Sequence, residues 1–153
     1  MPSVFHPAAG LEVLSLEESA PLELALAAGG VAAGFPSPAQ DHLEGTIDLN
    51  RELVQHPAST FCVRVRGESM REANLLDGDL LIVDRSLEPY QGCVAVCILD
   101  GEFTVKHFHR REGSVVLEPA NPRFRPIVVA PDRDFAVWGV VSYAVHKICR
   151  RAP

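Results

Sequence analysis

After residue 59 the chain is a succession of short apolar segments separated by turn-forming residues. In residues 61–66 apolar and polar side chains alternate, which is typical of a strand with one buried face. Asp100-Gly101 indicates a tight hairpin, because glycine readily adopts a positive φ. Further strands are expected at residues 79–84, 92–99, 102–109, 114–117, 126–130 and 135–148. The pattern predicts a mostly β fold, as a compact antiparallel β-sandwich or open barrel.

The first 59 residues do not show this pattern of short apolar segments. Residues 11–28 are rich in Leu, Ala and Glu and have weak helical character, and glycines and prolines interrupt the chain from residue 29 to residue 38. Residues 1–40 are therefore expected to form a mobile arm with one short helix. Residues 48–55 can form a further turn or two of helix, with Asp48 as N-cap and Pro57 as the stop.

Composition and charge narrow the class of protein. The 153 residues are 47% hydrophobic and 22% charged, which fits one packed domain with an appended arm. Fourteen basic against twenty acidic residues give a formal charge of −6, which argues against binding nucleic acid by broad neutralisation of its phosphates. No direct sequence-specific DNA binding is expected. No apolar run reaches the roughly 18–20 residues of a membrane span, and no Lys or Arg precedes Arg51. We expect a cytoplasmic protein that makes no membrane contact and meets DNA through partners.

The cysteines give no sign of a redox or metal site. Cys62, Cys93 and Cys97 lie inside apolar strand-like runs, and the fourth cysteine is Cys149. The four contain no Cys-x-x-Cys pair. We interpret the first three as small buried core residues. There is also no glycine-rich phosphate loop, so no nucleotide cofactor is expected.

Ser69 and Lys106 are the first candidate for catalysis. Ser69 lies between a strand and a helix-like segment, where backbone N–H groups can converge on an oxyanion. Lys106 lies in a strand flanked by aromatic residues, and partial desolvation there would favour its neutral form. A neutral amine beside a hydroxyl is the Ser-Lys form of an activated nucleophile. On these residues alone, a helix-capping serine and a solvated lysine are the commoner case.

Two other clusters are weaker candidates. His107 and His109 fall on one face of a strand and His146 could be a third zinc ligand, but no thiolate or carboxylate partner is suitably spaced. Asp77 and Asp79 could form an acid–base pair, although Asp-Gly-Asp is also ordinary turn sequence. We therefore expect neither a metal nor an organic cofactor.

The order of several motifs along the chain favours a catalytic role for Ser69 and Lys106. The chain resembles the self-cleaving serine peptidases of the LexA/UmuD type (family S24) over roughly residues 32–141. The resemblance rests on Gly67-Glu68-Ser69-Met70, on the Asp-Gly-Asp-Leu-Leu-Ile-Val-Asp run at 77–84, and on Asp-Gly-Glu-Phe-Thr-Val-Lys at 100–106. Upstream, the segments at 34–39, 47–50 and 55–57 resemble the UmuD branch more than the repressors.

The resemblance implies a role for each motif residue. Ser69 would be the nucleophile and Lys106 the general base, with backbone N–H groups of Gly67 and Ser69 holding the oxyanion. The family cuts itself after a small residue followed by Gly, here Ala33–Gly34; Ala28–Gly29 is a second such bond but lacks the Phe-Pro-Ser-Pro that follows the first. The implied division is an arm (1–33) removed by cleavage, a remainder (34–59) and a Ser-Lys peptidase β domain (60–153).

The resemblance also implies a place in the SOS response. A RecA filament on single-stranded DNA would stimulate self-cleavage, and residues 34–153 would form a homodimer that joins a UmuC-type Y-family DNA polymerase for translesion synthesis in error-prone repair.

Three other classes of protein share part of this pattern. A signal peptidase shares the Ser-Lys chemistry but needs a membrane anchor. A LexA-like repressor is expected to carry a helix-turn-helix domain before the cleavage site, whereas only 33 residues, without Lys or Arg, precede Gly34. A non-catalytic polymerase-accessory binding module would not need Ser69, Lys106 and Ala33–Gly34 intact.

Overall fold

The chain folds into two compact units. The computed structural model describes residues 12–15, 20–27, 33–34 and 43–149. One unit is formed by Glu18–Gln55, and the other by Met1–Glu17 together with His56–Pro153. The smaller unit contains a two-stranded antiparallel sheet, β2 (Glu23–Ala27) with β3 (Leu43–Asp48), followed by the helix α1 (Leu49–Leu53).

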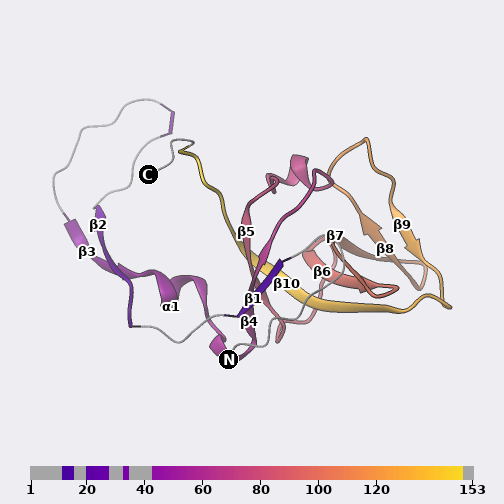
Figure 1. Ribbon diagram of the computed structural model, residues 1–153, viewed down its shortest axis with the longest axis horizontal. Coiled ribbons are helices and arrows are strands. Elements are labelled where there is room, and N and C mark those ends of the chain that lie inside the picture. The colour runs from indigo at the N-terminus through magenta and orange to yellow at the C-terminus, as the bar shows by residue number, and fades with distance from the viewer. Residues whose placement is uncertain (1–11, 16–19, 28–32, 35–42, 150–153) are drawn as a thin grey trace. The chain divides into compact units, whose positions relative to one another are not determined.

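The larger unit is built on one eight-stranded sheet in the order β1-β4-β5-β10-β6-β7-β8-β9, in which every neighbouring pair is antiparallel (Figure 1). Two short 3-10 helices, η1 (Pro57–Ser59) and η2 (Arg71–Ala73), flank β4 and precede β5. The strands are β1 (Glu12–Ser15), β4 (Thr60–Arg64), β5 (Leu80–Asp84), β6 (Val94–Leu99), β7 (Glu102–Arg111), β8 (Ser114–Glu118), β9 (Ile127–Val129) and β10 (Phe135–Val145).

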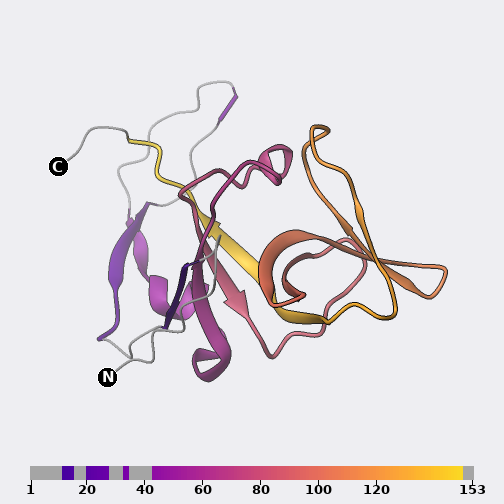
Figure 2. The same ribbon diagram turned by 45° about the vertical axis from the view of Figure 1, so that its right-hand side comes forward.

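The long strand β10 joins the two halves of this sheet (Figure 2). Its first half pairs with β6 and its second half with β5, and the register shifts after Val137 and after Val141. Gly139 lies at this crossing, where an added Cβ would come 2.6 Å from Val83 Cγ1. Glycine is therefore required because the backbone of β10 passes so close to β5.

Two apolar clusters form the core, and strands β6 and β7 contribute to both. Val96 belongs to one cluster, whereas its neighbours Ala95 and Cys97 belong to the other, so both faces of β6 are buried. Burial on both faces explains why this segment is almost continuously apolar. The first cluster is Val63, Val65, Met70, Leu75, Leu81, Val83, Val96 and Val105, and the second is Cys93, Ala95, Cys97, Phe108, Leu117 and Val140.

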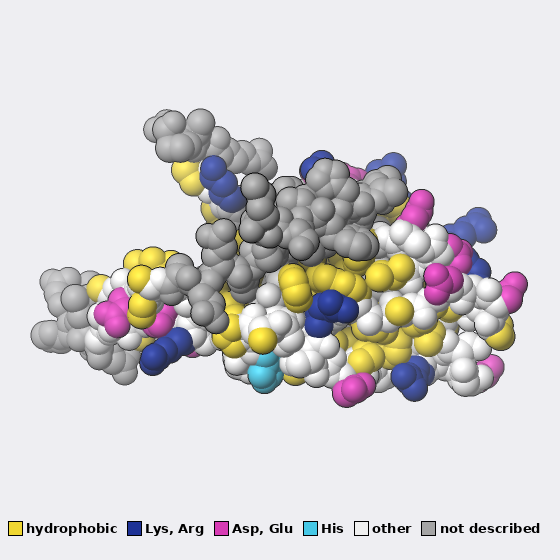
Figure 3. Space-filling view, turned by 60° about the horizontal axis from the view of Figure 1, so that its bottom comes forward, with side chains coloured by type: hydrophobic (Ala, Val, Ile, Leu, Met, Phe, Trp, Pro, Cys, Tyr) yellow, Lys and Arg dark blue, Asp and Glu magenta, His cyan; other side chains and the backbone are white. Residues whose placement is uncertain are grey.

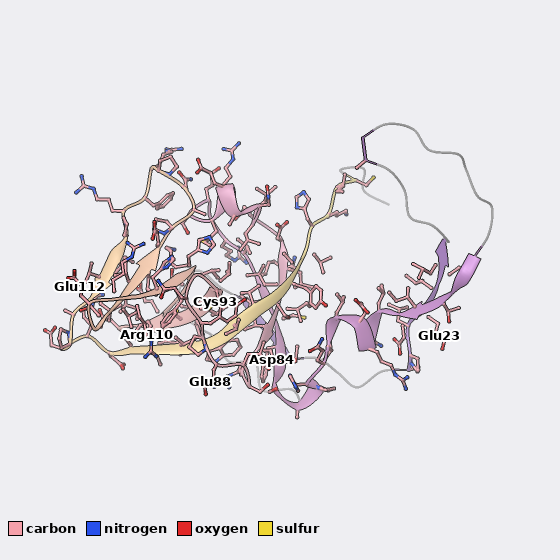
Figure 4. All side chains as sticks on the ribbon, turned by 180° about the vertical axis from the view of Figure 1, so that it is seen from behind. Glu23, Asp84, Glu88, Cys93, Arg110 and Glu112 are labelled. Atoms are coloured by element: carbon pink, nitrogen blue, oxygen red, sulfur yellow. The ribbon has the colours of Figure 1, made fainter. Side chains whose placement is uncertain are left out.

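Asp84, labelled in Figure 4, lies at the end of β5 and holds the segment around η1 against the sheet of the larger unit. Its Oδ2 lies 2.5 Å from His56 Nδ1, and its Oδ1 accepts from Ser59 Oγ at 3.1 Å and from Ser86 N at 2.8 Å. Burial alone would raise the pKa of Asp84, but these hydrogen bonds outweigh it and lower the pKa to about 2.

Most expectations for the β domain are confirmed. The fold is mostly β and antiparallel, and each of the seven strands expected after residue 59 is present. Asp100 (φ 50°) and Gly101 (φ 82°) both have positive φ, as a type I′ hairpin turn requires. Glu112 (φ 51°) and Gly113 (φ 79°) make a second turn of this kind, which the sequence analysis missed. Cys62, Cys93 and Cys97 are buried free thiols, as expected, and Cys149 is exposed.

The expectation for residues 11–28 is wrong. The described parts of this segment are the strands β1 and β2, not a helix. Leu22, Leu24 and Leu26 alternate with other residues in steps of two, and pairing with β3 outweighs the helix propensity of Leu, Ala and Glu. The mobility of the arm stays a prediction; the rest of residues 1–40, apart from 20–22 and 33–34, lies outside the described residues.

The short helix near residue 50 is confirmed. α1 begins after Asp48, whose Oδ1 accepts from Asn50 N at 3.0 Å as an N-cap, and it ends before Pro57. The division at residues 33/34 and 59/60 stays a prediction. Within the described part of the chain, no helix is long and apolar enough to cross a membrane.

Candidate active site

The structure brings Ser69 and Lys106 into direct contact. Lys106 Nζ donates a hydrogen bond to Ser69 Oγ at 2.8 Å. Lys106 is in the middle of β7 and its residue exposure is 8%, whereas Ser69 lies half-buried in the loop that follows β4. The same amine donates to Thr104 Oγ1 at 2.9 Å and to the Val105 carbonyl at 3.0 Å. Three oxygens therefore fix the amine beside the hydroxyl.

The surroundings of Lys106 favour its neutral form. Burial lowers the pKa of Lys106 below its ordinary value of 10.5, because the charged amine loses hydration. Cys97 opposes this shift, but burial raises the pKa of its own thiol to about 12, so it carries no charge at neutral pH. Desolvation therefore dominates, and the amine gives up its proton more readily than a lysine in water.

The loop that carries Ser69 is fixed by Asp77. Gly67 has φ +90°, which glycine adopts without strain, and its N–H donates to Asp77 Oδ1 at 2.7 Å. Asp79 is 4% exposed; its Oδ2 accepts from Leu76 N at 2.9 Å, and its Oδ1 lies 2.6 Å from His146 Nδ1. The two carboxylates thus hold separate parts of the backbone rather than facing one shared site.

Residues 120–121 support the same loop from the other side. Ala120 N donates to the Ser69 carbonyl at 2.8 Å, and Asn121 Nδ2 donates to the Glu68 carbonyl at 2.9 Å. Asn121 is 8% exposed, and its Oδ1 accepts from Arg123 N at 3.0 Å. In a trans peptide the C=O and N–H groups point in opposite directions. Because Asn121 binds the Glu68 carbonyl, the N–H of Ser69 in the same peptide group points away from the Asn121 side chain.

A pocket of about 120 Å³ opens beside the two residues. Its walls are polar and apolar in nearly equal parts, and Ser69, Thr104 and Lys106 lie among the polar residues that line it. It is lined in addition by Val65, Arg66, Gly67, Met70, Leu75, Phe103 and Val105. Its volume has room for one side chain.

The structure also describes most of the other candidate residues. Ala33 and Gly34 are exposed and form a bend in the chain of the smaller unit, and Ala28–Gly29 lies outside the described residues. His107 Nδ1 lies 3.2 Å from the Gly92 carbonyl, and His109 lies against Gln91 and Glu118. The described residues contain no group of three or more His, Cys, Asp or Glu side chains placed to hold a metal ion.

Sequence reasoning missed two residues of the site. Thr104 precedes Lys106 by two positions on one strand, so the alternation of side chains could have placed both on one face. Asn121 contacts a carbonyl 53 positions away, and no local pattern signals such a contact.

Comparisons with known proteins agree with the motif order. The profile of the Peptidase S24-like family matches residues 25–142, a span that includes Ala33–Gly34, Ser69 and Lys106. The chain is 42% identical over 117 residues to Protein ImpA of Salmonella typhimurium, covering 75% of this chain and 78% of that protein. It is 38% identical over 124 residues to Protein MucA of Escherichia coli (79% and 84%), and 43% identical over 123 residues to the LexA repressor of Bordetella avium (77% and 57%). The expected resemblance is confirmed, and the chain belongs to the Peptidase S24-like family.

Proposed function

We propose that this chain is a self-cleaving serine peptidase that cuts its own Ala33–Gly34 bond, with Ser69 as the nucleophile and Lys106 as the general base. The observation that carries the proposal is the 2.8 Å contact between Ser69 Oγ and an amine whose pKa is lowered by burial. A lysine that loses its proton readily, beside a hydroxyl and next to a pocket, has the chemistry that a Ser-Lys peptidase needs.

The reaction begins when Lys106 is neutral. Its free Nζ lone pair then accepts the Ser69 hydroxyl proton while Oγ attacks the carbonyl carbon of Ala33. The resulting ammonium gives this proton to the nitrogen of Gly34, the bond between Ala33 and Gly34 breaks, and an acyl-enzyme remains on Ser69. Water then attacks the acyl group, Lys106 accepts one water proton, and this proton passes to Ser69 Oγ as Ala33 leaves as a carboxylic acid, which releases its proton to solvent.

The oxyanion of each tetrahedral intermediate needs backbone donors. Of the two groups expected from the sequence, the N–H of Gly67 already donates to Asp77. We therefore assign the oxyanion contact to the N–H of Ser69. Its direction is set by the hydrogen bonds that the Glu68 carbonyl, in the same peptide group, accepts from Asn121 Nδ2 at 2.9 Å and from Arg71 N at 3.2 Å.

The chosen bond suits the pocket. A pocket of about 120 Å³ has ample room for the methyl group of Ala33. Gly34 has no Cβ, so the chain beyond the bond can bend sharply into or away from the site.

Membership of the family and the UmuD-like segments at 34–39, 47–50 and 55–57 support a role in SOS mutagenesis. In this role a RecA filament on single-stranded DNA stimulates the cut, and residues 34–153 act as a homodimeric subunit of a UmuC-type translesion polymerase in the cytoplasm. Basic and acidic side chains are interspersed on the face in Figure 3, and the formal charge is −6, which suits a protein that reaches DNA through partners.

Intact-mass spectrometry tests the cleavage. The purified full-length protein is incubated at mildly alkaline pH, with and without RecA filaments on single-stranded DNA. We expect a product that begins at Gly34, in larger amount with the filaments, and none from Ser69→Ala. A stable product with another N-terminus, or the absence of any product under both conditions, would refute the proposal.

A further inference from the structure

Residues that precede the proposed cut contribute two strands to the fold. β1 pairs with β4 in the larger unit, and β2 pairs with β3 in the smaller one (Figure 1). The first pairing joins Glu12–Ser15 to Phe61, Cys62, Val63 and Arg64, and the second joins Glu23–Ala27 to Leu43, Gly45, Thr46, Ile47 and Asp48. Each pairing joins a segment on one side of Ala33–Gly34 to a segment on the other side.

Residues 20–22, just before β2, make further hydrogen bonds to residues that follow Ala33–Gly34 in the sequence. Leu22 N donates to Asp48 Oδ1 at 3.1 Å, and Leu49 N donates to the Leu22 carbonyl at 2.9 Å. Asn50 Nδ2 donates to the Ala20 carbonyl at 3.1 Å. Residues 20–22 thereby bind the capped start of α1.

Hydrolysis of Ala33–Gly34 removes none of these contacts. The bond lies in the connection between β2 and β3, and strand pairing depends on the backbone of the strands rather than on the continuity of the loop that joins them. Because two separate strands belong to the same fragment, one strand that opens is held near its partner by the other.

We propose that self-cleavage nicks the chain without releasing residues 1–33, which stay bound through β1 on the edge of β4 and through β2 on β3. The proposal rests on the proposed cut at Ala33–Gly34. Release of the fragment is then a separate second step. It turns β4 from an inner strand into an edge strand with unpaired N–H and C=O groups.

The test separates the nick from the catalytic activity. A recognition sequence for a site-specific protease is inserted directly after Gly34 in the Ser69→Ala variant of the full chain, and added protease makes the nick. Denaturing mass spectrometry confirms the cut, and gel filtration with native mass spectrometry measures association. We expect both fragments in one peak at the elution volume of the uncut protein, in a 1:1 ratio. Recovery of the N-terminal fragment in a separate low-mass peak would overturn the proposal.

Wild-type protein that cleaves itself is analysed in parallel. If it does not cleave, the proposed function fails, whereas the protease-nicked variant still decides whether residues 1–33 stay bound. The two failures are therefore distinguishable.

Backbone variants test the contacts directly. In an antiparallel pair, residues alternate between hydrogen-bonded and non-hydrogen-bonded positions, so Val13→Pro/Leu14→Pro removes at least one donor to β4. In the nicked protein we expect the β4 amides that face β1 to exchange hydrogen about tenfold faster, or more, in this variant, with β6 unchanged. The matched control Val13→Ala/Leu14→Ala keeps both N–H groups and should exchange like the parent.

Adding Leu24→Pro/Ala25→Pro to the proline pair also breaks β2–β3, and this combined variant should release the fragment on gel filtration. Equal exchange in β4 of the proline and alanine variants, or retention of the fragment by the combined variant, would contradict the proposal.

Discussion

Replacing Lys106 by methionine should abolish self-cleavage and remove a pH-dependent cost to stability. The two side chains have similar length, but methionine carries no titratable group. Lys106 is almost fully buried, and burial lowers its pKa from 10.5. The protonated amine therefore costs free energy in the folded state, and the variant does not bear this cost.

The sign follows from proton binding. Because the folded-state pKa is below the unfolded value, the unfolded chain binds the proton more tightly, and the cost is present in full below the folded pKa. The cost falls as pH rises and disappears above about 10.5, where Lys106 is neutral in both states. Each unit by which the pKa is lowered corresponds to about 1.4 kcal/mol. Loss of the hydrogen bonds to Ser69 and Thr104 costs about 0.5–1.5 kcal/mol each and offsets part of the gain.

Urea unfolding at pH 7, 8.5 and 10 measures this difference. We expect the free energy of unfolding of Lys106→Met, relative to wild type, to be highest at pH 7 and to decline toward pH 10. Lys147→Met, at an exposed lysine, is the control and should show no such trend. A difference for Lys106→Met that is constant with pH, or that grows with pH, would refute the reasoning.

The same titration should set the rate of the wild-type reaction. Below the folded pKa of Lys106 the neutral fraction rises about tenfold per pH unit, and the cleavage rate should rise with it. A rate that is flat or falls from neutral to mildly alkaline pH would contradict a lysine base.

Three further predictions follow from single contacts. Asn121→Asp loses the donor to the Glu68 carbonyl but keeps the acceptor for Arg123 N, so cleavage should slow by about tenfold or more with an unchanged pH midpoint. The control Asn74→Asp, at an exposed site, should cleave normally, and equal rates for the two variants would exclude a positioning role for Asn121. Gly139→Ala should destabilise the larger unit by about 1–3 kcal/mol in urea unfolding, because the added Cβ overlaps Val83, whereas Gly34→Ala has open space around it and should not destabilise the protein. An unchanged urea midpoint for Gly139→Ala would contradict the close approach of β10 to β5. Asp84→Asn should lower the free energy of unfolding by about 2 kcal/mol at pH 7, because the stabilisation from the ionised Asp84 carboxylate is present above pH 3.8 and is lost as pH falls through about 2. An equal loss of stability at pH 7 and pH 2 would contradict this role of the Asp84 carboxylate.

The sequence predicted those features that depend on neighbouring residues. Alternation of apolar and polar side chains identified the strands after residue 59, and Asp100-Gly101 identified its hairpin, because both signals are local. The pairing of β1 with β4 and the contact of Asn121 with Glu68 escaped prediction, because each joins residues about fifty positions apart. The helix predicted for residues 22–27 is wrong because their composition favours a helix, whereas their leucines alternate as in a strand.

The candidate site shows the same limit. Ser69 and Lys106 were singled out by the order of motifs, since nothing local distinguishes them from a capping serine and a solvated lysine. Their contact, the burial of the amine and the engagement of Gly67 by Asp77 depend on how β4, β5 and β7 pack together. These properties required the structure.

The most direct test of the account compares the cleavage rates of wild type, Ser69→Ala, Lys106→Ala and the double variant, with circular dichroism of the same samples. Groups that act as one unit lose their effects non-additively, so each single variant should lose cleavage and the double variant should be little worse. All four should keep the β spectrum, because neither truncation removes a core side chain of the two apolar clusters. Cleavage near the wild-type rate by either well-folded single variant would contradict the assignment of Ser69 and Lys106.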